Sequence, residues 1–214
     1  MPTGDGVTSR AKARSSGPLR WHTDRCDVVG LLCVRPARRG GTSRVVSVPA
    51  VSNAILERRP DLHALLCAPY HHVREGEAGG KQQHYAMPVF GLRDGRLTSQ
   101  YSRTFVENAQ GLPGVPPLTT AQNEALDLWA EVCEELCYGM DMQAGDLQLL
   151  NNHLVYHARA TYEDDPRPNH DRFLMRLWLS MPNSRALPEG FEALWGSIEP
   201  GALRGGIAQT GVRA

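Results

Sequence analysis

Glycine and proline divide this chain into short apolar segments, and that division limits the folds open to it. The longest apolar run, Val28–Val34, is far below the ~20 residues that a membrane-spanning helix needs. Aliphatic, β-branched and aromatic residues predict strands at 27–34, 43–48, 85–92 and 173–180. Residues 147–159 predict two short strands or one bent strand. Many short strands with few helices favour a mainly β sandwich or jelly roll with flanking helices.

Local signals place turns and helices between these strands. Asp94-Gly95 predicts a tight hairpin. Thr119, with Gln122 three residues later, has the spacing of a helix-capping box. The clearest helix follows it, because apolar residues recur there at helical spacing: Ala125, Leu128, Trp129, Val132 and Leu136. Shorter helices are expected at 49–57 and from Pro60.

Composition favours one intracellular domain. The 214 residues suit a single core, with a flexible tail at 1–19, a folded domain at 20–206 and a second tail at 207–214. Lys+Arg and Asp+Glu both number 23, so no global basic field directs the chain to nucleic acid or to a membrane. The first 20 residues contain no apolar signal core, and the five cysteines form no CxxC pair. A reduced, cytoplasmic setting is therefore expected.

His22 and Asp24 form a candidate metal-binding pair. Residues two apart in a strand point to the same side, so an imidazole and a carboxylate at this spacing can bind one ion. His157, in a downstream strand, can supply a third ligand. Two histidines and one carboxylate leave three open positions, the arrangement typical of oxygen-activating non-haem Fe(II) sites. A pair spaced like His22 and Asp24 is common by chance, so it needs support from the surrounding sequence.

Two arginines on the last strand supply part of that support. Arg172 and Arg176 are four residues apart, so both face the same side of the strand. Two like charges on a buried face are costly unless an anion accompanies them. A dicarboxylate cosubstrate would provide that anion. Two surface arginines explain the spacing equally well.

Four motifs in order give a family resemblance. They are WHTD at 21–24, Gly-Gly-Thr-Ser at 40–43, GDLQLLNNHLVYHAR at 145–159 and RFLMRLWLS at 172–180. Together they resemble the TauD/TfdA family of Fe(II)/2-oxoglutarate dioxygenases over residues 20–206. The resemblance implies a double-stranded β-helix, in which His22, Asp24 and His157 are the iron ligands.

The resemblance also implies roles for residues around the metal. Arg172 and Ser43 would bind the distal carboxylate of 2-oxoglutarate, with Thr42 as the alternative if the register differs by one. Arg176 would face the primary substrate. Asn152 and Arg103 are further candidates for the substrate pocket, although Asn152 suits a turn or strand end equally well. His153 and the pair His71-His72, beside the polar loop 73–83, are weaker candidates.

The implied chemistry uses Fe(II), O2 and 2-oxoglutarate, which is converted to succinate and CO2 while a small substrate, either anionic or neutral, is oxidised. Because Asp24 retains a carboxylate where related halogenases have a small residue, hydroxylation, desaturation or cleavage is favoured over halogenation. A cupin-like barrel holding zinc or manganese is a competing interpretation, against which the Arg172 match argues.

The position of His22 departs from the family pattern. Relatives carry many tens of residues before this motif, and here only 21 precede it. We therefore expect either a start placed too late or a truncated member that lacks its first strands. Exposed sheet edges would then favour homo-oligomers. A truncated, non-catalytic relative that serves as a ligand-binding or interaction module is the alternative to an active enzyme.

Overall fold

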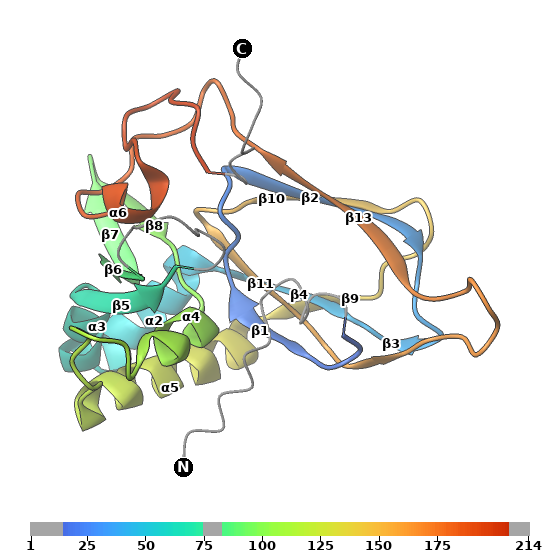
Figure 1. Cartoon of the computed structure of the whole chain (residues 1–214), viewed down its shortest axis with the longest axis horizontal. Helices are drawn as coiled ribbons and strands as arrows, with labels where there is room; N and C mark the ends of the chain where they lie inside the picture. Colours follow the sequence, from blue (N-terminus) through green and yellow to red (C-terminus); the bar gives the residue numbers. More distant parts are fainter. Residues whose placement is uncertain (1–14, 75–82, 206–214) are drawn as a thin grey trace.

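The computed structural model describes residues 15–74 and 83–205 and is mainly β with few helices (Figure 1). Two of its sheets have more than two strands. One has the order β1-β11-β4-β9 (Leu19–His22, Val155–Arg159, Ser43–Ser47, Tyr138–Met140). The other has the order β10-β2-β13 (Leu147–Asn151, Val28–Arg35, Phe173–Leu179). All pairings in both sheets are antiparallel.

The two sheets face each other across a small apolar core. Alternation along each strand sends every second side chain inward. Val29, Leu150 and Trp178 of the three-stranded sheet meet Val45 and Val155 of the four-stranded sheet there. This layer lies next to the metal-ligand candidates, and so it fixes the spacing of the elements that carry them.

The larger core lies between the four-stranded sheet and the helices. The helices of the described chain are α2 (Val48–Arg58), α3 (Pro60–Leu66), α4 (Arg103–Ala109), α5 (Thr120–Leu136) and α6 (Glu192–Trp195). Tyr156 and Val46 point from the sheet into this core and meet Trp129 of α5 and Ile55 of α2. The outward positions of β11 and β4 are thus covered, while their inward positions remain available for a site.

Several local predictions are confirmed. The capping box of α5 is present: Thr119 Oγ1 accepts from the Gln122 N–H, and Gln122 Oε1 accepts from the Thr119 N–H. Asp94 and Gly95 have φ angles of 51° and 71° and join β7 (Phe90–Arg93) to β8 (Arg96–Ser99). Two residues with positive φ are what the tightest hairpin turn requires. Residues 147–159 form two strands rather than one bent strand.

The expected strand at 85–92 is wrong in its extent. It divides at Val89 into β6 (His84–Pro88) and β7, and β6 pairs with β5 (Pro69–Val73), which the sequence did not predict. The backbone explains the break, because the Val89 N–H bonds to Leu66 at the end of α3 instead of continuing a ladder. Residues 39–40 form a two-residue strand, β3, paired with β12 (Tyr162–Glu163).

The expected boundary at residue 20 lies inside β1. Residues 15–19 have partners, because the Tyr162 N–H donates to the Ser16 carbonyl and Arg159 donates to that of Ser15. Residues 1–14 of the expected tail at 1–19, the expected tail at 207–214 and most of the loop at 73–83 lie outside the described residues. All five cysteines are free thiols. Within residues 15–74 and 83–205, no helix has the length and apolar character needed to cross a bilayer.

Candidate metal centre

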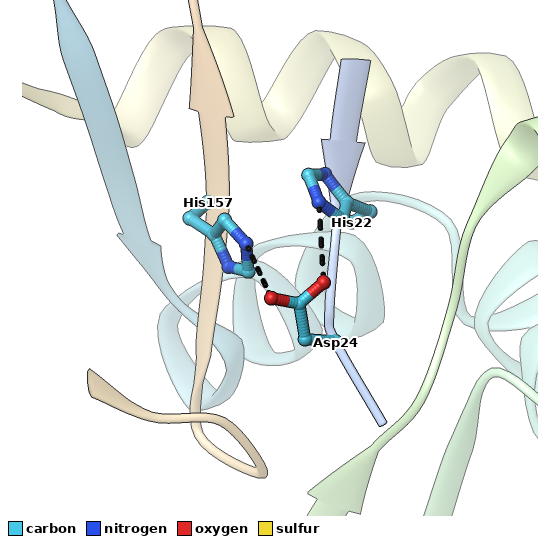
Figure 2. A group of neighbouring side chains, drawn as sticks. All are labelled: His22, Asp24 and His157. Atoms are coloured by element: carbon cyan, nitrogen blue, oxygen red, sulfur yellow. Dashed lines mark ion pairs between the residues drawn. The ribbon is translucent and has the colours of Figure 1, made fainter. Parts of the chain in front are cut away.

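Strand pairing brings His22 and His157 together from positions 135 residues apart in the chain. The two are directly opposite each other in the β1–β11 ladder, so their side chains lie on one face. Asp24 follows β1 after one intervening residue. Figure 2 shows the three side chains converging, with one ligand atom from each lying within 4.8 Å of the others.

The distances within this group suit a shared ion. His22 Nε2 is 3.8 Å from Asp24 Oδ1, and His157 Nε2 is 3.8 Å from Asp24 Oδ2. The ring centroids of the two histidines are 4.3 Å apart. Asp24 and His157 are buried, while His22 is partly exposed, so the group opens toward solvent on the His22 side.

The hydrogen bond made by His22 leaves its other nitrogen free to bind a metal. Its Nδ1 lies 2.8 Å from the carbonyl oxygen of Arg20, and only a protonated Nδ1 can make that bond. Nε2, which faces Asp24, therefore carries the lone pair that a metal would use. A backbone carbonyl that fixes the tautomer in this way is a common feature around metal-binding histidines.

The protonation states also fit a metal ligand set. Burial, together with nearby His22, lowers the pKa of His157 to about 3 despite the opposing charge of Asp24. Burial alone would raise the pKa of the Asp24 carboxyl, but the two histidines, Arg176 and Trp178 outweigh that effect and lower it. A neutral imidazole and a charged carboxylate are the forms that bind divalent metals.

Two side chains of β13 hold the carboxylate of Asp24. The indole N–H of Trp178 donates to Oδ2 at 2.7 Å, and Arg176 Nη1 lies 3.3 Å from both carboxylate oxygens. The Arg176 guanidinium also lies over the Trp178 ring at 4.8 Å. Arg176 was expected to face the substrate. Its side chain is 38% exposed and lies beside the candidate metal-ligand group, which consists of His22, Asp24 and His157. Sequence reasoning missed Trp178, although its position two residues after Arg176 places it on the same face.

Asn152 fixes the backbone around Asp24. Its Oδ1 accepts from the Asp24 N–H at 2.8 Å, and its Nδ2 donates to the carbonyls of Asp24 and Cys26. The side chain is fully buried. Asn152 therefore holds the turn that carries the candidate ligand Asp24. The sequence had left open both a place in the substrate pocket and a place at a turn or strand end.

Arg172 lines a separate polar cavity of about 310 Å³. The cavity also contains Arg38, Arg39 and one acidic side chain, Asp141. Burial lowers the pKa of Arg172, whose guanidinium lies 5.2 Å from the centre of the Tyr162 ring. This concentration of guanidinium groups gives the cavity the chemistry of a carboxylate-binding site.

Ser43 does not line that cavity. It is buried on β4, and its hydroxyl donates to Gln148 Oε1 of β10 at 3.3 Å. The neighbouring Thr42 donates to Asp141 Oδ1 at 2.6 Å. Neither hydroxyl has a contact with Arg172 in the structure, so the predicted pairing of Ser43 with Arg172 stays a prediction.

The remaining candidates have other partners. Arg103 pairs with Glu107 of α4 at 3.0 Å and with Asp127 of α5 at 2.8 Å, which ties two helices together. This placement does not support the expected position in a substrate pocket. His153 Nε2 bonds to the buried carboxylate of Asp27 at 2.8 Å. His71 and His84 meet through their Nδ1 atoms at 3.1 Å.

Comparison with known proteins decides the family. The model of the family described as "Taurine catabolism dioxygenase TauD, TfdA family" matches residues 3–178. The chain belongs to the TauD/TfdA family. FR-33289 synthase of Streptomyces rubellomurinus is 30% identical over 185 residues, which cover 83% of this chain and 54% of the relative. The taurine hydroxylase-like protein SAT17 of Stachybotrys chartarum is 32% identical, with 81% and 44% covered.

Solved structures share the fold of this TauD/TfdA member. An asparagine oxygenase in complex with Fe(II), 3-hydroxyasparagine and succinate has a TM-score of 0.61 at 19% identity, over 84% of this chain and 55% of its own. The non-haem iron oxygenase OrfP with Fe and α-ketoglutaric acid has a TM-score of 0.58 at 18% identity, with the same coverage. The chain spans about half the length of the relatives that it matches.

Proposed function

We propose that this TauD/TfdA member is an Fe(II)- and 2-oxoglutarate-dependent oxygenase that hydroxylates a small molecule in the cytoplasm. The observation that carries the proposal is the convergence of His22, Asp24 and His157 at metal-binding distances, with a hydrogen bond that fixes the tautomer of His22. Membership of a dioxygenase family supports it. The chain would fold as one unit over residues 20–206, and its two facing sheets would be part of a double-stranded β-helix.

Each residue of the centre has a distinct part in this proposal. His22 and His157 would supply neutral nitrogen ligands, and Asp24 the negative charge that favours a divalent ion. Bound Fe(II) would supply oxygen activation. Trp178 and Asn152 would hold Asp24 in place from the side chain and from the backbone.

The arginine-lined cavity supports 2-oxoglutarate as the cosubstrate. Arg172 offers a planar fork of donors that suits a carboxylate. Because its guanidinium is partly buried, fewer water molecules can take the place of a bound carboxylate. Arg159 and Arg172 both lie close to the Tyr162 ring, and burial, followed by repulsion from Arg172, lowers the pKa of Arg159. A bound carboxylate would offset that repulsion. Ser43 or Thr42 remains a proposed second contact.

A small anionic or zwitterionic molecule fits best as the primary substrate. Arg176 is partly exposed beside the metal-ligand group, and among the described residues its ion pair is with Asp24. The solved relatives carry amino acids or hydroxylated amino acids: 3-hydroxyasparagine in one and 3-hydroxyarginine in another. Amino acids and their derivatives are therefore the first substrates to screen.

The decisive test is 2-oxoglutarate turnover by protein purified without air. We expect succinate formation that requires added Fe(II) and is abolished in Asp24→Ala. Asp61→Ala, an exposed carboxylate on α3, is the matched control and should retain full activity. Succinate formation by Asp24→Ala at the rate of the unmodified chain would refute the proposed centre.

The geometry of His22, Asp24 and His157 supports metal binding and does not by itself require turnover. A binding or interaction module that retains ligand binding without turnover is therefore the second candidate function. Fe(II) and 2-oxoglutarate would then bind with normal stoichiometry, while no substrate in the panel would give succinate. Calorimetric titration beside the turnover assay separates the two functions.

A further inference from the structure

The three-stranded sheet β10-β2-β13 has two apolar faces, and among the described residues only one of them is covered. Its inner face carries Val29, Leu150 and Trp178, which pack toward the other sheet. Its outer face is made by the alternate residues. We define the outer leucine face as these side chains: Leu32, Val34, Leu147, Leu149, Met175, Leu177 and Leu179.

Strand register makes this face continuous. Leu147, Leu32 and Met175 form one row across the three strands, and Leu149, Gly30 and Leu177 form the next. The side chains of the second row close over the glycine: a Cβ at Gly30 would lie 3.3 Å from Leu149 Cδ2 and 3.8 Å from Leu177 Cβ. The result is a flat apolar surface without a gap at its centre.

The face is exposed to an unusual degree. Six of its side chains are between 38% and 61% exposed, with Leu149 at 59% and Leu177 at 61%. In Figure 1 the helices lie to one side of this sheet, and within the described residues none packs on its outer side. An antiparallel sheet with one solvated face normally alternates apolar with polar residues. Here the outward positions include no charged residue, and Asn151 is the polar exception.

The size of the face fits pairing of two copies. Six large side chains, each about half exposed, present on the order of 600 Å² of apolar surface, which reaches the upper limit for patches on ordinary monomers. Two such faces together would bury about 1,200 Å², the lower end of the range for stable protein interfaces. Two sheets that pack face to face lie ~10 Å apart, with their mean strand directions within about 30° of each other.

We propose that a second copy of this chain covers the outer leucine face, giving a two-fold dimer in which the β10-β2-β13 sheets pack against each other. A two-fold axis lets the same patch serve both partners. The absence of charge makes self-pairing free of like-charge repulsion. The metal-ligand group faces the opposite side of the sheet, so this proposal is independent of the proposed function.

The test is sedimentation of the full chain from about 1 µM to about 100 µM, concentrations that bracket micromolar affinities. We expect a monomer–dimer equilibrium. The double variant Leu149→Glu/Leu177→Glu places four carboxylates in the apolar interface and should weaken dimerisation at least 100-fold. Leu92→Glu, at a 67% exposed leucine on β7, is the matched control and should dimerise normally. Far-UV circular dichroism checks that each variant folds.

Three results would overturn the proposal. If the chain stays monomeric at the highest concentration, the dimer is excluded and the face would have to be covered by a different polypeptide. A dimer that survives the double variant would indicate pairing elsewhere, for example along the free edge of β13. Open-ended association would contradict a closed pair. If the glutamate variant does not fold, Leu149→Thr/Leu177→Thr keeps good strand formers and must still reduce dimerisation.

Discussion

Trp178 donates its indole N–H to Asp24 Oδ2 at 2.7 Å, which ties β13, the last strand of the described residues, to the only carboxylate of the metal-ligand group. The bond crosses from β13 to the segment after β1. It adds to the Arg176 contact at 3.3 Å, so two donors orient one carboxylate before any metal arrives. Preorganisation of this kind reduces the cost of binding an ion.

Trp178→Phe should therefore weaken metal binding. The substitution keeps an aromatic ring in the core and removes only the hydrogen-bond donor. Loss of such an outer contact typically reduces metal affinity about 10- to 100-fold. Titration with Mn(II), followed by electron paramagnetic resonance, measures the affinity without any need for turnover. Trp195→Phe is the control, because its buried indole N–H has no partner in the described structure and its loss should leave Mn(II) binding unchanged.

Asn152→Ala should destabilise the fold. Three hydrogen bonds from this fully buried side chain hold the backbone of residues 24–26, and the substitution leaves those backbone groups unpaired. Unpaired buried groups cost on the order of 1–3 kcal/mol each, so a loss of about 2–4 kcal/mol is expected after partial relaxation. Urea unfolding measures it. Asn183→Ala, at an exposed position, should change the stability by less than about 0.5 kcal/mol.

These contacts mark what the sequence can and cannot predict. The spacing of His22 and Asp24 placed both on one face, and the family resemblance added His157 and Arg172. The capping box of α5 and the Asp94-Gly95 turn were readable because they depend on neighbouring residues. Pairing of β5 with β6 and the ion pairs of Arg103 depend on partners far away in the chain, and no local pattern encodes them.

His72 should make stability depend on pH. Burial lowers its pKa to about 4, although a hydrogen bond with the Met87 backbone opposes this shift. Among the described residues its Nε2 has no hydrogen-bond partner. The unfolded chain takes up a proton near pH 6.5, before the folded chain does. Stability is thus fully present above pH 6.5 and is lost as the pH falls toward 4, by at most about 3 kcal/mol from this group.

His72→Phe tests that contribution. Phenylalanine fills a similar volume beside Tyr85, on which the His72 ring stacks, and it cannot take up a proton. Urea unfolding at a series of pH values should show a shallower decline between pH 6.5 and 4 than in the unmodified chain. His170→Phe, at an exposed loop residue, should leave the slope unchanged. Equal slopes for His72→Phe and the unmodified chain would contradict the assignment.

Arg172→Lys should separate cosubstrate binding from metal binding. Lysine keeps the positive charge in the cavity but loses the planar pair of donors that holds a carboxylate at two points. The Kd for 2-oxoglutarate, measured by calorimetry on the Mn(II)-loaded chain, should rise at least about tenfold, or about 1.4 kcal/mol. The affinity for Mn(II) itself should be unchanged, because Arg172 lines a cavity that none of the three metal-ligand candidates lines.

Arg39→Lys, an exposed guanidinium in the same cavity, is the control for charge alone. If both lysine variants weaken 2-oxoglutarate equally, the cavity acts through its overall charge, and Arg172 has no special part in it.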